Sequence, residues 1–320
     1  MPVAPDHSRM RKVLSAAFTP RRIAAMEGKI QQVTDLLLDR LVECAAAGGA
    51  VDFMENFAVR VPLAVMCDLM GVPREDWSRF RPLAEDLNAT LEMLIDDAQL
   101  AAADAAAAEL DEYMSALVEL RRADPRDDLI SVLLAEADGE DAQLDSRELL
   151  ANLELLLVAG FETTTNLLGN ALALLFDHPE VREGLLAGTY TYAQFIEEVL
   201  RFDPPVQHMI RSAGEPGMKL AGVPIPVGAE LVMLMGSANR DPLRFPDPDT
   251  FNPARPDNQP LSFGGGAHYC IAAGLARLEG VTALSRLLAR YPRIALSGTP
   301  IRADRHGLRG FRELPVVLDR

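Results

Sequence analysis

Cys270 lies between neighbours that favour a reactive or ligating thiolate. The segment FGGGAHYCIAAGLARLE, residues 263–279, has glycines before the cysteine and the start of a predicted helix after it. The free N–H groups and positive dipole of a helix N-terminus stabilise a thiolate. Glycines such as Gly264 and Gly266 let the backbone approach a flat, bulky group and adopt positive φ without a Cβ clash. A buried, inert cysteine does not account for these glycines.

Several chemistries could use such a thiol. A Cys-His nucleophile is one, since His268 is two residues away. A structural zinc site is a poorer fit because no second cysteine lies near. A metal macrocycle with acidic side arms, held by one axial thiolate, uses all of the features, with Phe263 covering the sulfur and His268 donating to an anion at the rim. That description fits haem, with Cys270 as the metal ligand.

The same loop resembles the haem-binding loop of the cytochrome P450 family, F-x-x-G-x-x-x-C-x-G. Phe263, Gly266 and Cys270 match this pattern, and Gly264 lies inside it. Ala272 stands where the family has glycine. The added methyl group is expected to loosen the packing on the porphyrin or to tune the iron, without preventing binding.

The segment AGFETT, residues 159–164, resembles the oxygen-activating A-G-x-[DE]-T motif of the family. A polar pair in an apolar helix centre is costly unless it is hydrogen-bonded or useful. We expect Thr163 to bond back to a helix carbonyl and open a groove for O2 and water beside Ala159 and Gly160. Glu162 is then expected to relay protons from solvent as a catalytic group. The alternative is a capped polar pair in a kinked helix.

Three further residues resemble the Glu-Arg-Arg cluster of the family. Glu198 and Arg201 form its E-x-x-R motif and share one helix face, and Arg255 in FNPAR is the third member. The resemblance implies a structural role, tying the segment before the cysteine loop to the helix. The alternative is an exposed salt bridge, which contributes little.

A basic set is implied to hold the haem propionates. His7 and Arg11 in DHSRMR resemble the family's H-x-x-x-R, and one helical turn separates them. Arg211 matches a further propionate-binding arginine, and His268 joins it from the cysteine loop. His208 is left as a candidate for the pocket wall.

These resemblances imply a haem-thiolate monooxygenase of the soluble bacterial type. It would bind heme b (iron protoporphyrin IX) and insert one oxygen atom from O2 into an apolar small molecule. Its electrons would come from a ferredoxin and a ferredoxin reductase. Arg9, Lys12 and Arg277 are basic candidates to receive that donor, although exposed basic residues are usually only solvated surface.

The resemblance covers nearly the entire chain but begins at the His7 helix. Members of the family normally carry an upstream segment, so we expect an N-terminally truncated form. Strands near 231–234 would then lose neighbours, and the pocket above the iron would lose part of its roof. The alternative function is a non-catalytic relic or haem-binding protein. The Glu162-Thr163 pair favours the enzyme, and the missing segment favours the relic.

The elements that position these residues read as one domain over residues 1–320, mainly α with a small β portion. Capping-box patterns predict a long oxygen-activating helix at about 145–177 and a shorter helix from Thr191. Strand-like runs follow residue 218, and LRGFRELPVVL suggests a terminal hairpin strand. The haem-thiolate loop spans 263–272.

Composition narrows the class of protein. The chain has 320 residues and a formal net charge of -16, which argues against a nucleic-acid binder. Its three cysteines lie far apart, and Cys44 and Cys67 read as core residues. Neither a secretory signal nor an uninterrupted apolar membrane span is recognisable. We therefore expect a cytoplasmic protein.

Overall fold

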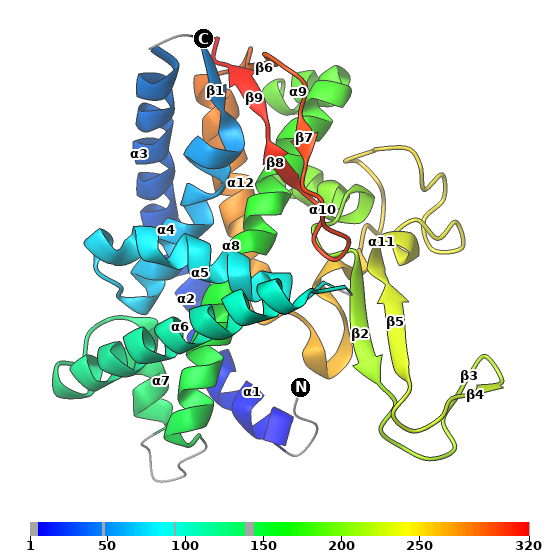
Figure 1. The fold of residues 1–320 in the computed structure, drawn as a ribbon. Coiled ribbons are helices and arrows are strands. Elements are labelled where there is room, and N and C mark those ends of the chain that lie inside the picture. Colours follow the sequence, from blue (N-terminus) through cyan, green and yellow to red (C-terminus); the bar gives the residue numbers. More distant parts are fainter. Residues whose placement is uncertain (1–5, 47–48, 93, 138–143, 320) are drawn as a thin grey trace.

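The computed structural model describes residues 6–46, 49–92, 94–137 and 144–319. Helices dominate this part of the chain, with α8 running through its middle (Figure 1). The α-helices are α1 (Asp6–Ala17), α2 (Pro20–Ala25), α3 (Glu27–Ala46), α4 (Arg60–Met70), α5 (Trp77–Ala89), α6 (Asp97–Ala123), α7 (Leu129–Ala137), α8 (Ser146–Asp177), α9 (Pro179–Leu186), α10 (Tyr192–Phe202), α11 (Met235–Ala238) and α12 (Ala273–Arg290).

The strands are short and belong to small antiparallel sheets. They are β1 (Ala50–Asp52), β2 (His208–Ser212), β3 (Lys219–Leu220), β4 (Val223–Pro224), β5 (Glu230–Leu234), β6 (Ala295–Leu296), β7 (Ile301–Arg302), β8 (Phe311–Glu313) and β9 (Pro315–Val317). In the described ranges the strand orders are β1-β9-β6, β2-β5, β3-β4 and β7-β8. The mainly helical class with a small β portion is therefore confirmed.

The segment predicted to be a terminal hairpin strand contains two strands, and the first of them, β8, forms an antiparallel pair with the preceding strand β7. β8 pairs with β7, whereas β9 pairs with β1 and β6, so the two consecutive strands enter different sheets. Pro315 opens β9, and Leu314 between the two strands is fully buried. The chain passes through the core at this point instead of turning back on itself.

Local sequence fixes both ends of α8. Asp145 accepts a hydrogen bond from the backbone N–H of Glu148, whose side chain accepts one from the N–H of Asp145, as the capping-box pattern predicted. The helix ends at Asp177, just before His178 and Pro179, because proline cannot continue a helix. Thr191 and Gln194 form the second predicted box, at the start of α10.

Two hydrophobic clusters divide the length of α8. Its first half, with Leu153 and Phe161, packs into one cluster together with α1, α4, α6 and α7. Its second half, with Leu168 and Leu175, packs into the other, together with α3, α10 and α12. The polar run 162–166 lies at the boundary, where the functional side chains meet the core. No helix within the described ranges is long and apolar enough to cross a membrane.

Candidate functional site

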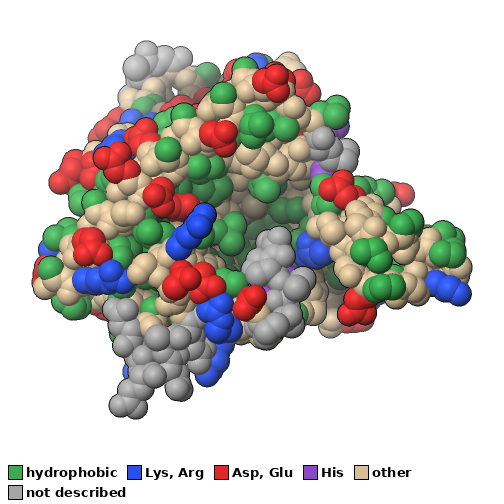
Figure 2. Space-filling model, turned by 60° about the horizontal axis from the view of Figure 1, so that its bottom comes forward, with side chains coloured by type: hydrophobic (Ala, Val, Ile, Leu, Met, Phe, Trp, Pro, Cys, Tyr) green, Lys and Arg blue, Asp and Glu red, His purple; other side chains and the backbone are tan. Residues whose placement is uncertain are grey.

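A cavity of about 410 Å³ lies between α8 and the cysteine loop. Its walls come from α1, α8, β2, the cysteine loop and the start of α12, and they are mostly apolar. Figure 2 shows the molecule hollowed on one face, with hydrophobic side chains around the hollow. Leu155 is 51% exposed and Ala159 is also exposed, although both lie in the central helix. Their exposure is consistent with a face of α8 that is open to the cavity.

The cysteine loop is built as the glycine pattern predicted. Gly264 and Gly266 have φ values of 71° and 63°, a region that disfavours any residue with a Cβ. The N–H of Cys270 donates to the carbonyl of Phe263 at 2.8 Å and closes the loop. α12 then begins at Ala273, three residues beyond the cysteine. Cys270 and the glycine turn both line the cavity.

The environment of the sulfur is less favourable to a free thiolate than the sequence suggested. Burial raises the pKa of the Cys270 thiol, and the N–H of Ala272 and the charges of Arg11 and Arg277 only partly offset this. A bound metal ion would supply the missing positive charge. In the described ranges no hydrogen bond joins His268 to Cys270, so a Cys-His nucleophile lacks its base. Nor do those ranges hold a cluster of metal-ligating side chains such as zinc requires.

Four basic side chains gather at the cavity. The rings of His7 and His268 lie 4.0 Å apart. Arg11 donates to the carbonyl of Tyr269 at 2.5 Å, and Arg211 donates to the carbonyl of the preceding residue at 2.9 Å. Burial lowers the pKa of His268, as do the charges of His7, Arg211 and Arg11. Neither arginine pairs with a carboxylate in the described part of the chain, so this set fits the acidic side arms of haem.

α8 presents part of the predicted A-G-x-[DE]-T motif to the cavity. Ala159, Gly160 and Thr163 line it. Thr163 Oγ1 donates to the carbonyl of Ala159 at 2.9 Å, which is the expected back-bond. A Cβ on Gly160 would lie 2.8 Å from the sulfur of Met66, so the Met66 side chain of α4 would have to shift to admit any larger residue.

Glu162 does not contribute to the cavity lining. It forms an ion pair with Arg305, from the loop between β7 and β8, and one of its oxygens is buried without a partner in the described ranges. Burial raises the pKa of Glu162, and Arg305 opposes that effect. Glu162 thus lies next to the back-bonded Thr163 but is held on another side of the helix.

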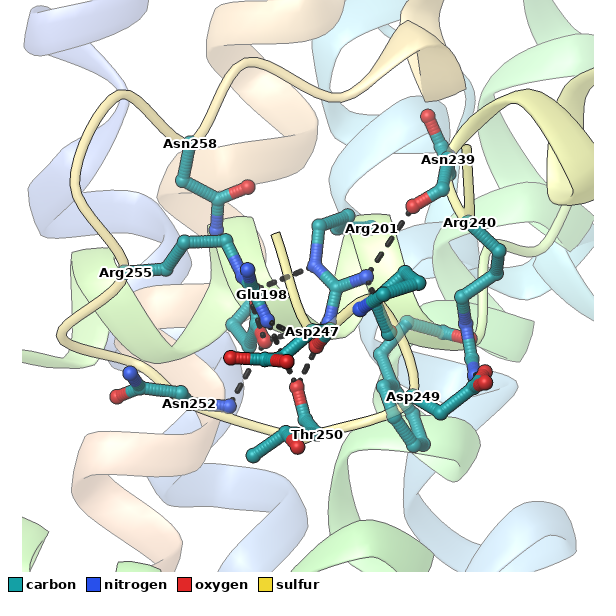
Figure 3. A network of polar contacts seen from close by, with 12 residues as sticks. Glu198, Arg201, Asn239, Arg240, Asp247, Asp249, Thr250, Asn252, Arg255 and Asn258 are labelled. Atoms are coloured by element: carbon teal, nitrogen blue, oxygen red, sulfur yellow. Dashed lines mark hydrogen bonds and ion pairs between the residues drawn. The ribbon is translucent and has the colours of Figure 1, made fainter. Parts of the chain in front are cut away.

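The Glu198-Arg201-Arg255 cluster lies in the core (Figure 3). Glu198 and Arg201 are both 0% exposed, which rules out an exposed salt bridge. Arg201 Nε and Nη2 donate to the two carboxylate oxygens of Glu198 at 2.8 Å each. Arg255 lies 3.5 Å from Glu198, and the N–H of Asn252 donates to the same carboxylate at 2.8 Å. The cluster ties α10 to the segment that leads into the cysteine loop.

Two of the basic candidates for a redox partner are already engaged. Arg9 binds Glu148 through two hydrogen bonds of 2.8 and 2.6 Å. Arg277 pairs with Glu197 of α10. Only Lys12 of the three is an exposed side chain. The role of all three residues in contacting a redox partner stays a prediction.

Sequence reasoning missed two residues of the site. Glu279 of α12 lines the cavity although it is 1% exposed, and burial raises its pKa to about 8. Its only sequence signal was a lone acid in the stretch 278–284, which apart from Thr282 is otherwise apolar. Arg305, the partner of Glu162, lies 143 residues further along the chain and carried no signal.

Comparison with known proteins agrees with this geometry. The sequence model described as Cytochrome P450 matches residues 2–187 and 189–308. The chain is 38% identical over 318 residues to the vitamin D(3) 25-hydroxylase of Pseudonocardia autotrophica, covering 98% of this chain and 76% of that protein. It is 36% identical over 321 residues to the 6-deoxyerythronolide B hydroxylase of Saccharopolyspora erythraea, with the same coverage.

A solved structure shares the fold. P450BioI, in complex with an acyl carrier protein ligated to hexadec-9Z-enoic acid, matches with a TM-score of 0.93 and 32% identity, over 99% of this chain and 81% of that one. The named relatives are hydroxylases and monooxygenases, which are oxidoreductases. The cysteine loop, the Thr163 face of α8 and these matches together show that the chain belongs to the cytochrome P450 family.

Proposed function

We propose that the protein is a haem-thiolate monooxygenase that uses Cys270 as the axial ligand. The observation that carries the proposal is one cavity shared by the Cys270 sulfur, a cluster of basic side chains and the Thr163 face of α8. Heme b bound there would supply O2 binding and activation, as cysteine-ligated haem does in this family. The glycine turn lets the backbone approach the macrocycle, and His7, Arg11, Arg211 and His268 hold its carboxylates.

Thr163 and Glu162 are proposed to act in oxygen activation and proton transfer. Since Thr163 Oγ1 donates to the Ala159 carbonyl, its lone pairs are free to accept a hydrogen bond from water in the cavity. Glu162, beside it in the chain, is 14% exposed and exchanges its proton on the side of Arg305. Thr163 thus orients a water on the cavity side, and Glu162 holds a proton one residue away.

The proposed substrate is an apolar small molecule. The mainly apolar walls of the cavity, including Leu155, Leu156 and Met209, support this class. Named relatives hydroxylate vitamin D(3) and 6-deoxyerythronolide B. A ferredoxin and a ferredoxin reductase are the proposed electron donors, and Lys12 is the remaining exposed basic candidate for that contact.

The absorption spectrum of the reduced, CO-bound chain after haem supplementation tests the proposal. We expect the strongly red-shifted Soret band that thiolate ligation produces. Cys270→Ser should lose this band, whereas Cys67→Ser, at a buried cysteine outside the cavity, should keep it. A band typical of His-ligated haem, or no haem uptake, would contradict the proposal and favour the non-catalytic alternative.

A further inference from the structure

Glu279 is a buried acid directed at the cavity. Leu275, Ala276 and Glu279 all line it, and their spacing places them on one face of α12. Glu279 is 1% exposed, and its Oε2 has no hydrogen-bond partner within the described ranges. A buried carboxylate without a partner is strongly destabilising, whereas a protonated carboxyl that bonds to water is tolerated.

Two acids of α8 also have raised pKa values, but a charged group lies beside each of them. Glu162 faces Arg305, whereas burial and the negative charge of Asp111 of α6 raise the pKa of Glu154 to about 7. Neither Glu154 nor Glu162 lines the cavity. The acid that lines the cavity is Glu279 of α12, and burial raises its pKa.

The helices around Glu279 leave it in apolar surroundings. A Cβ on the next residue, Gly280, would lie 3.0 Å from Ile196 of α10 and 3.5 Å from Leu167 of α8, so the packing there is tight. Charged groups on α12 and on the helices in contact with it are paired: Arg277 with Glu197, Arg286 with Asp35, Arg201 with Glu198, and Glu162 with Arg305. Burial is the cause of the raised pKa of Glu279, so neither these groups nor Arg11 and Arg211, which line the same cavity, stabilise its carboxylate.

We infer that Glu279 is a positioning residue that keeps a proton at its carboxyl group and donates it in a hydrogen bond to water between α12 and α8. The inference rests on the proposed function. The carboxyl exchanges one proton with this water, and a proton from solvent replaces it, so no other reactant is needed. The cavity would thus contain an acid distinct from Glu162.

Infrared spectroscopy of the haem-loaded full chain tests the protonation directly. Wild type should show a protonated-carboxyl C=O band at pH 7 that shifts in D2O and is missing in Glu279→Gln. The band should fade as the pH rises through about 8, the pKa that burial gives Glu279. Glu154→Gln is the matched control, because it removes a buried acid outside the cavity and should leave the Glu279 band in place. If wild type minus Glu279→Gln shows no such band, the inference fails.

The positioning role needs a second readout. In Glu279→Leu the amount of product formed per electron consumed should fall several-fold, because leucine cannot form a hydrogen bond to water. The solvent isotope effect of D2O on this ratio should also change. Glu279→Asp, which keeps an acid, should restore part of that coupling, and Glu154→Gln should leave it unchanged. Unchanged coupling in Glu279→Leu would reduce Glu279 to a structural acid. Absence of the red-shifted CO band in wild type would instead reject the proposed function and leave the infrared result intact.

Discussion

The Glu198-Arg201 cluster and the Cys270-Glu279 cavity bury polar groups in opposite ways. Arg201 satisfies its guanidinium group with Glu198 and with the carbonyls of Asn239, Pro248 and Thr250. In the cavity, burial disfavours the charged forms of Cys270 and Glu279; the charges of Arg11 and Arg277 only partly offset this effect at Cys270, and no charge offsets it at Glu279. A buried polar group that has its hydrogen-bond partners stabilises the fold, whereas a buried polar group that lacks them is typical of a functional site.

Removing one partner from the satisfied cluster should have the largest effect. Arg201→Ala leaves the Glu198 carboxylate buried and unpaired, which should lower the free energy of unfolding by about 3–5 kcal/mol. Denaturant unfolding measures this loss. Arg79→Ala, which breaks an exposed pair with Glu109, should change it by less than about 1 kcal/mol. Equal losses in the two variants would remove the distinction between the regions.

Removing a charge from the cavity should affect binding more than folding. Arg211→Ala should weaken haem affinity about 10- to 100-fold, because a charge-assisted hydrogen bond contributes about 1.5–3 kcal/mol. Haem titration followed by absorption measures the change. Arg312→Ala, at an exposed arginine of β8, should bind haem as wild type does. An unchanged affinity in Arg211→Ala would exclude it from the propionate set.

The Glu162-Arg305 pair should give a pH-dependent effect. Since burial raises the folded-state pKa of Glu162, the folded state keeps its proton where the unfolded state loses it, and stability falls as the pH rises through that window. Arg305→Ala removes the opposing charge, so the folded-state pKa rises further and the loss grows with pH. We expect Arg305→Ala to lower the free energy of unfolding by about 1–2 kcal/mol at neutral pH, and to change it little below the ordinary pKa of glutamate.

Denaturant unfolding at several pH values checks this expectation, and Glu162→Gln provides the comparison. Adding Arg305→Ala to a chain that already carries Glu162→Gln should produce no pH-dependent loss. A loss that is independent of pH in both backgrounds would mean that Arg305 acts through packing alone.

A change at Ala272, which stands where the family has glycine, should have the smallest effect on stability and haem binding. Its φ of −95° suits any residue, so Ala272→Gly should change the free energy of unfolding by less than about 1 kcal/mol and leave the CO-bound Soret band in place. Gly264→Ala, at φ 71° and ψ −156°, should lower it by about 1–3 kcal/mol. Thermal unfolding of the haem-loaded variants compares them, and a larger effect at Ala272 than at Gly264 would contradict this reading of the loop.

Most of the helices and much of the candidate site could be predicted from the sequence. The capping boxes at Asp145 and Thr191 fixed helix starts because they act within four residues. The i, i+3 spacing placed Glu198 beside Arg201, and the glycines indicated where positive φ was needed. The order of the motifs indicated the family before any contact was known. Each of these signals is local, or comes from segments already recognisable one by one.

Tertiary structure alone decided what each helix face meets. Helical spacing relates Glu162 to Thr163, but only the packing of α8 between two clusters turns Thr163 to the cavity and Glu162 to Arg305. The packing of α12 likewise turns Glu279 inward, and α10 and α8 supply the acids that engage Arg277 and Arg9. The sequence determined which groups exist and how they are spaced along each element. Which groups find partners depends on contacts between residues far apart in the chain, and no local pattern encodes those contacts.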